Sequence, residues 1–199
     1  TALADVSGGV NDSGVLKLTV NENGQSGAYI IAPLEGGAEV SAFTAAFRMR
    51  VGGGSDVPAD GFSFNFASDF PNSTLGDAEE GAGTGIIVAF DIYDNAGGEA
   101  PSIDVKYAGQ VVASTKVPIG FIRTGDAFAQ VLAQLNTDGT FDLSYNDNIV
   151  YRKLVLPGFR AISNGKFAWA ARTGGLNENM WVDDIKIKTT KSSGPLRIT

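Results

Sequence analysis

The sequence contains no cysteine and no histidine among its 199 residues. Without cysteine there is no disulfide, no thiol nucleophile and no thiolate zinc site. Without histidine there is no Ser-His-Asp triad, no imidazole general base and no imidazole metal ligand. A metal bound by this chain must therefore be a hard cation held by oxygen atoms, which indicates calcium.

The chain also lacks a surplus of basic residues and any long apolar run. Its formal net charge is -7, which argues against nucleic acid and anionic membrane surfaces as partners. No apolar segment reaches the ~20 residues needed to span a bilayer, so the sequence predicts no membrane insertion. Neutral sugars and cations are the partners compatible with this charge.

Short alternating runs between Gly, Asn and Asp turns take the place of long helices. In residues 43–51, Phe43 and Phe47 fall on one face and Arg48 and Arg50 on the other, which is the period of a β-strand. The same reasoning predicts further strands at residues 61–67, 86–90, 103–107, 110–115, 127–135, 140–145, 149–151, 167–171 and 181–188.

Turn signals between these runs predict hairpins at Ala108-Gly109 and Asp138-Gly139. Many short strands with closely spaced turns indicate an all-β sandwich or jelly roll in a single domain, residues 1–190. The first residues, up to about residue 12, are polar and Gly-rich and are expected to be loose or an edge strand. Residues 191–199 are expected to form a C-terminal linker or tail.

The segment from Val88 to Glu99 is the most informative in the chain, because an apolar strand leads directly into a group of oxygen ligands. Asp91 and Glu99 offer carboxylates, Asn95 an amide oxygen and Tyr93 a backbone carbonyl. Calcium takes six to eight such oxygens in flexible geometry. The alternative is a polar surface turn with unpaired acids, and the local sequence leaves both open.

The chain resembles the L-type lectins, the family of the legume lectins and the animal secretory-pathway cargo lectins. The resemblance extends over residues 15–189. It rests on four groups of residues in the family's order: the opening strands at 14–19, 28–30 and 41–47, the Ala59-Asp60-Gly61 segment, the metal loop 90–95 with the strand at 103–105, and the last loop and strand at 170–182. It implies a concanavalin A-like jelly-roll β-sandwich of two antiparallel sheets.

The resemblance also implies which residues bind. Calcium would be held by Asp91, the Tyr93 carbonyl, Asn95 and Glu99, where Glu99 replaces the family's aspartate. A saccharide would be bound by Asp60, after a cis peptide bond to Ala59, and by neighbouring groups. The predicted carbohydrate-binding residues are Asp60, Gly83, Tyr93, Asn95, Gly175 and Leu176.

Two positions depart from the legume lectins, which hold a second, transition metal through a glutamate and a histidine. Those places are Ala89 and Ala100 in this chain. Without the glutamate and the histidine, the second metal site is lost and calcium alone is expected, as in the animal members.

Three functions remain open at this point. The first is calcium-dependent, non-catalytic carbohydrate binding by a secreted, extracellular or cell-surface lectin-like module, either as a homodimer or within a larger protein. The second is an adhesion or structural module with the same fold and no sugar binding. The third is a glycoside hydrolase or polysaccharide lyase. Related glucanases carry Glu-x-Asp-x-x-Glu on one strand, and Ala89 and Asp94 stand where this chain would need its glutamates.

Glu79 and Glu80 are expected to form a solvated loop.

Overall fold

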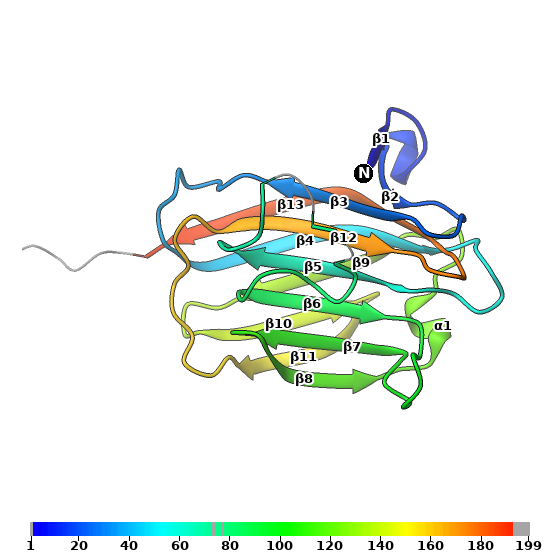
Figure 1. The fold of residues 1–199 in the computed structure, drawn as a ribbon. Coiled ribbons are helices and arrows are strands. Elements are labelled where there is room, and N and C mark those ends of the chain that lie inside the picture. Colours follow the sequence, from blue (N-terminus) through cyan, green and yellow to red (C-terminus); the bar gives the residue numbers. More distant parts are fainter. Residues whose placement is uncertain (1, 73–74, 77, 193–199) are drawn as a thin grey trace, which may run out of the picture.

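The structure is a computed structural model of the chain and describes residues 2–72, 75–76 and 78–192 (Figure 1). The elements in chain order are β1 (Leu3–Asp5), a 3-10 turn (Val10–Asp12), β2 (Val15–Thr19), β3 (Ser26–Ile31), β4 (Val40–Gly52), β5 (Gly61–Ala67), β6 (Ile86–Asp91), β7 (Ser102–Tyr107), β8 (Gln110–Lys116), α1 (Ile119–Ile122), β9 (Ala129–Leu135), β10 (Thr140–Tyr145), β11 (Asn148–Val155), β12 (Lys166–Arg172) and β13 (Asn179–Lys191). Each predicted strand overlaps one of these.

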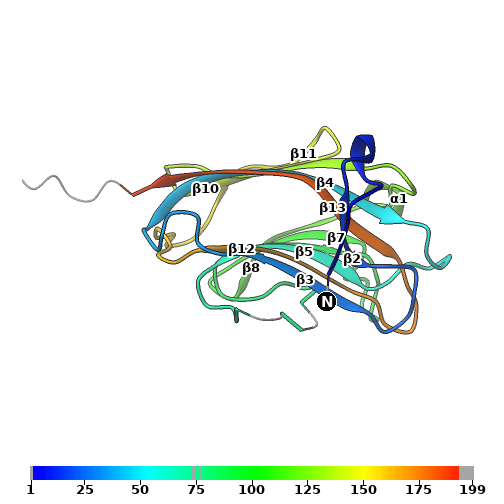
Figure 2. The same ribbon diagram turned by 90° about the horizontal axis from the view of Figure 1, so that it is seen from above.

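The strands form two antiparallel sheets packed face to face. One has seven strands in the order β1-β2-β13-β4-β9-β10-β11, and the other has six in the order β3-β12-β5-β6-β7-β8. Figure 2 shows the two layers from above, with the six-stranded sheet on the side that faces the viewer in Figure 1. The predicted jelly-roll β-sandwich is confirmed.

The core between the sheets follows from the alternation in the sequence. Along β4, Phe43, Phe47 and Met49 are at most 2% exposed and face the other sheet. The Phe47 ring meets the indole of Trp169 on β12 edge-on, with ring centroids 5.4 Å apart. Aromatic rings of both sheets interdigitate in this way, so burial of apolar surface fixes which face of each strand points inward.

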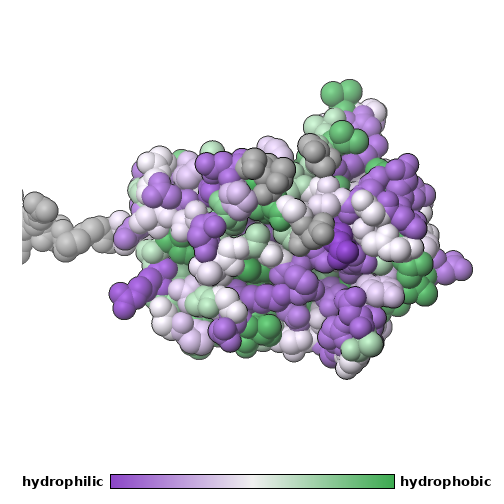
Figure 3. Space-filling model, in the orientation of Figure 1, coloured by the Kyte–Doolittle hydropathy of each residue, from purple (hydrophilic) through white to green (hydrophobic). Residues whose placement is uncertain are grey.

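The outer face of the six-stranded sheet is largely covered by hydrophilic and intermediate residues, with apolar residues in separate small patches (Figure 3). The long connection from β5 to β6 folds across this face: the Ser63 hydroxyl donates to the Ala78 carbonyl over 2.6 Å, and the Ala82 N–H donates to Oδ1 of Asn65 over 2.9 Å. This face carries the predicted site residues.

The start of the chain has one of the two predicted forms, and the last strand is slightly longer than predicted. The first residues contain a short edge strand, β1, which pairs with β2. Lys191 belongs to β13 and pairs with Val40, so the last strand continues one residue past the predicted boundary at 190. The rest of the predicted tail, residues 193–199, lies outside the described residues. No helix within the described part of the chain is long and apolar enough to cross a membrane.

The predicted hairpin at Ala108-Gly109 joins β7 to β8, and both turn residues have positive φ, 51° and 74°. Replacing Gly109 with alanine is expected to cost roughly 1–2 kcal/mol, because a side chain is disfavoured at positive φ and nothing within 4 Å compensates. Urea denaturation measures this. Gly120→Ala is the matched control: Gly120 also has no atom within 4 Å but lies in α1 without positive φ. Equal effects of the two substitutions would contradict the explanation.

Candidate functional site

The predicted ligand residues gather at one end of the six-stranded sheet. β6 and β12 end there and β5 begins there, at the right of Figure 1. The sheet register places Arg172 of β12 opposite Gly61 of β5, and Gly61 opposite Asp91 of β6. The loops that adjoin these strand ends therefore lie next to one another.

Asp60 joins these loops through its backbone. The Ala59-Asp60 peptide bond is cis, as the resemblance implied. The Asp60 N–H donates to the Arg172 carbonyl over 2.9 Å, and the Asp60 carbonyl accepts the N–H groups of Ile92 and Tyr93, each over 3.1 Å. The predicted sugar-binding residue is thus hydrogen-bonded directly to the start of the predicted calcium loop.

The guanidinium group of Arg172 lies beside Asp60, and this is the main feature of the site that the sequence did not predict. Nη1 of Arg172 lies 3.1 Å from Oδ2 of Asp60 and 3.0 Å from Oε1 of Glu79. The prediction of a solvated loop is wrong for Glu79, whose side chain is only 13% exposed, and right for Glu80, which is 49% exposed and pairs with Lys106. Because Glu79 and Asp60 share one guanidinium, Arg172 fixes the direction of the Asp60 carboxylate.

The prediction that Gly83 lines this site is wrong. A Cβ atom on Gly83 would lie 2.5 Å from Oδ1 of Asp69 and 2.8 Å from the Cβ of Ala67, the last residue of β5. That end of β5 is roughly 20 Å along the strand from Gly61. The β5–β6 connection runs lengthwise over the sheet, from Glu79 near Gly61 to Gly83 near Ala67, so Gly83 lies far from Asp60.

Asp91 is a buried carboxylate in acidic surroundings. It is 8% exposed, and burial raises its pKa to about 7, with the negative charge of Glu80 as the next cause. Asp104 and Glu99 add to the rise, and the Tyr93 N–H, which donates to Oδ1 of Asp91 over 3.3 Å, opposes it. A cation at this carboxylate would remove the penalty of ionising it.

The loop after Asp91 folds back on itself. The Glu99 carboxylate accepts the Asn95 N–H, and Nδ2 of Asn95 donates to the Tyr93 carbonyl over 3.4 Å. Asp94 accepts the Gly98 N–H over 3.0 Å, and its pKa is lowered, chiefly by a side-chain hydrogen bond with Glu99. The structure therefore brings Tyr93, Asn95 and Glu99 together in one turn.

The loop between β12 and β13 lies against Asp60 on its other side. A Cβ atom on Gly174 would come within 3.0 and 3.1 Å of the two Asp60 carboxylate oxygens. The Asn23 side chain donates to the Gly175 carbonyl over 2.8 Å. Gly175 is exposed and Leu176 is half-buried, and both directly follow Gly174 in this loop, so their role in sugar binding remains a prediction.

A buried ion pair anchors the base of that loop. Glu178 has a fully buried side chain, and Nε of Arg123 lies 2.7 Å from its Oε2. Oε1 of Glu178 accepts the Gly54 N–H over 2.6 Å, and Ser55 and Asn177 exchange backbone and side-chain hydrogen bonds. No local pattern in the sequence signals this pair, because its partners are distant in the chain.

Within residues 2–72, 75–76 and 78–192, no three His, Cys, Asp or Glu side chains converge on a common metal position. The predicted calcium ligands differ from such a cluster, because only two of them are carboxylates and the others are an amide oxygen and a backbone carbonyl. Their donors are all oxygen atoms, and the surplus of negative charge around Asp91 fits a divalent cation. This set of ligands remains a prediction.

Solved lectin structures share this architecture. The exoplasmic/lumenal domain of VIP36, in its form bound to Ca²⁺ and Man3GlcNAc, is 16% identical, has a TM-score of 0.72, and the match covers 100% of this chain and 88% of that one. The carbohydrate recognition domain of Emp47p is 16% identical with a TM-score of 0.66, covering 95% and 86%. Basic winged bean lectin with Tn-antigen is 14% identical with a TM-score of 0.68, covering 96% and 93%.

No protein-family model and no curated protein sequence matches the chain. The structural similarity shows the fold, which is that of the L-type lectins.

Proposed function

Because the chain has the L-type lectin fold, we propose that it binds saccharides without catalysing a reaction, and that calcium organises the binding loops. The observation that carries the proposal is the pair of hydrogen bonds from Ile92 and Tyr93 to the Asp60 carbonyl. They connect a carboxylate suited to sugar hydroxyls to a loop rich in oxygen donors. Calcium and mannose-containing glycan bound to the VIP36 domain add support.

Asp91, the Tyr93 carbonyl, Asn95 and Glu99 would hold the calcium ion. The ion would neutralise the carboxylates and fix the conformation of the loop. Asp91 contributes a carboxylate already in place at the end of β6, and the turn that brings Glu99 to Asn95 closes the loop. Because Ile92 and Tyr93 donate hydrogen bonds to the Asp60 carbonyl, a loop held by calcium would also fix the position of Asp60.

Asp60 and Asn95 would recognise the saccharide as an acceptor and a donor side by side, which matches adjacent sugar hydroxyls. The Tyr93 ring offers an apolar surface to the C–H face of the sugar, and Gly175 and Leu176 would form a wall beside Asp60 that selects among sugars. Hydrogen bonds to charged groups contribute only about 1.5–3 kcal/mol each, which predicts weak binding, with a Kd of the order of 0.1–1 mM for a monosaccharide. The proposal includes a location outside the cytoplasm, as for the exoplasmic/lumenal VIP36 domain.

A glycan array in calcium and in chelator tests the proposal. Calcium-dependent binding to at least one glycan is expected, together with no release of product from polysaccharides. Asp60→Asn is expected to weaken that binding about tenfold or more, because it removes a charged hydrogen-bond acceptor. Asp56→Asn is the control, since Asp56 is exposed in the same connection between β4 and β5. An array without binding in calcium, or product release by the wild-type protein, would sink the proposal.

A further inference from the structure

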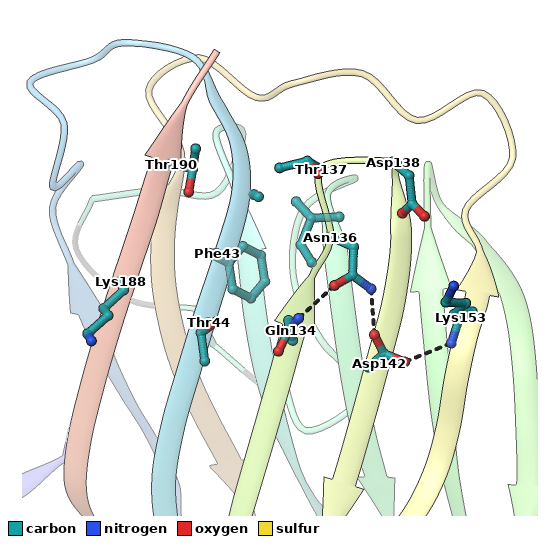
Figure 4. Close-up of a pocket in the computed structure, with 12 residues that line it drawn as sticks. Phe43, Thr44, Gln134, Asn136, Thr137, Asp138, Asp142, Lys153, Lys188 and Thr190 are labelled. Carbon is teal, nitrogen blue, oxygen red and sulfur yellow. Dashed lines mark hydrogen bonds between the residues drawn. The ribbon is translucent and has the colours of Figure 1, made fainter. Parts of the chain in front are cut away.

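A polar cleft lies on the outer face of the seven-stranded sheet (Figure 4). Its volume is about 620 Å³, and the residues used below, Thr44, Gln134, Asp142, Lys153, Lys188 and Thr190, are among those that line it. Thr44 is near the start of β4, whereas the connection to Asp60 leaves the end of β4. The cleft is therefore separate from the calcium and sugar site, and its size is that of a small-molecule site.

Polar side chains cross the floor of the cleft in a row. Lys188 of β13 is opposite Thr44 of β4, Thr44 is opposite Gln134 of β9, and Gln134 is opposite Asp142 of β10. The Lys153 N–H of β11 donates to Oδ1 of Asp142 over 2.8 Å. Opposite residues on neighbouring strands lie about 5 Å apart, so the row offers hydrogen-bonding groups at intervals close to the length of one pyranose ring.

An apolar strip runs beside this row. Ala46 is opposite Leu132, Leu132 is opposite Ser144, and Ser144 is opposite Ile149. A second hollow of about 350 Å³ covers part of the strip and shares Gln134 with the cleft. A sugar ring has a hydroxylated edge and a C–H face, and this surface presents a matching polar row and apolar strip.

The charge of this sheet is opposite to that of the chain. The strands of the seven-stranded sheet carry eight Lys and Arg against four Asp, although the chain has a net charge of -7. Four of these cations are paired with acids: Lys17, Arg48, Arg50 and Lys191. The other four have no ion pair within the described residues and lie in or beside the two hollows: Arg152, Lys153, Lys186 and Lys188.

The two acids of the cleft keep their negative charge, but the cations in and beside the two hollows outnumber them by four to two. Asp142 accepts the Asn136 amide and the Lys153 N–H. Asp138 accepts the N–H and hydroxyl of Thr140. This surface therefore keeps a net positive charge, and the ammonium groups of Lys153 and Lys188, which have no ion pair among the described residues, can meet an anionic ligand.

We propose that this cleft is a second saccharide site, which binds glycan chains carrying carboxylate or sulfate groups. Lys153 and Lys188, at the two ends of the row, pair with the acid groups. Thr44, Gln134 and Thr190 hydrogen-bond to the hydroxyls between them. The site needs neither calcium nor Asp60, so it is independent of the proposed lectin site.

Isothermal titration calorimetry in chelator tests this with three probes of similar length: an oligogalacturonate, a sulfated dextran oligomer and neutral dextran. At least one acidic probe is expected to bind at least about tenfold more tightly than the neutral probe. Whether the carboxylated or the sulfated probe binds identifies the acid group that the cleft recognises. Lys153→Gln with Lys188→Gln is expected to weaken this binding at least about tenfold. Lys116→Gln with Arg160→Gln removes the same charge from exposed positions outside this sheet and is expected to change it little.

Asp60→Asn separates the two sites and is expected to leave binding of the acidic probe unchanged. Equal weakening by the two double variants would show non-specific attraction and overturn the proposal. Equal binding of the neutral probe, no binding of either acidic probe, or loss of binding in Asp60→Asn would also overturn it. Thermal melts confirm that each variant is folded before titration.

Discussion

Replacing Asp91 with asparagine is expected to stabilise the calcium-free protein at pH 8 by roughly 2–4 kcal/mol. The carboxylate is buried beside other acids, and its pKa is raised to about 7. The folded protein therefore binds this proton more tightly than the unfolded chain does. The stabilisation from protonation is complete below about pH 4 and is lost as pH rises through about 7, and an amide at this position does not lose it.

Urea denaturation in chelator at pH 5 and pH 8 measures this effect. The wild-type protein is expected to lose stability between these values, and Asp91→Asn to lose less. Asp138→Asn is the control: hydrogen bonds from Thr140 lower the pKa of Asp138 below 3.8, so its titration lies outside this range. Calcium at about 100 times its Kd should stabilise the wild type by about 2.7 kcal/mol and leave Asp91→Asn unchanged. A wild-type protein equally stable at both pH values in chelator would refute the assignment.

The strands and most turns could be predicted because their signals are local. The alternation of β4 is visible in nine consecutive residues, 43–51, and all of its predicted inward side chains are buried. The turn at Ala108-Gly109 needs positive φ at both residues, which such a pair tolerates. For these elements the sequence pattern and the burial it requires agree, so no knowledge of distant contacts is needed.

The site could be predicted only in part, because it depends on how distant segments meet. Asp91 and Asn95 were found from the oxygen donors that follow an apolar strand, and Asp60 through resemblance to a known arrangement of motifs. Arg172 was missed because its role beside Asp60 follows from the register of β12 with β5, which no local pattern encodes. Gly83 was misplaced for a related reason: a glycine-rich loop does not reveal in which direction it crosses a sheet.

Replacing Arg123 with leucine is expected to destabilise the protein by roughly 3–5 kcal/mol, because it leaves the buried Glu178 carboxylate without its cation. The Glu178 side chain is fully buried, and Nε of Arg123 is 2.7 Å away. Arg123 also donates to the Ser55 carbonyl over 2.7 Å, so its loss loosens both segments that support Gly175 and Leu176. We therefore expect weaker glycan binding as well as lower stability.

A double-mutant cycle separates the charge from the packing. Arg123→Leu with Glu178→Leu removes both charges and is expected to recover much of the stability lost in Arg123→Leu, since apolar replacements of a buried pair are often close to neutral. Arg48→Leu is the control, because the side chains of Arg48 and its partner Asp184 are 41% and 38% exposed and surface pairs contribute only about 0–1 kcal/mol. If the double variant is no more stable than Arg123→Leu, the cost lies in packing and in the Ser55 contact. If its stability recovers while glycan binding stays weak, the ion pair itself positions the wall beside Asp60.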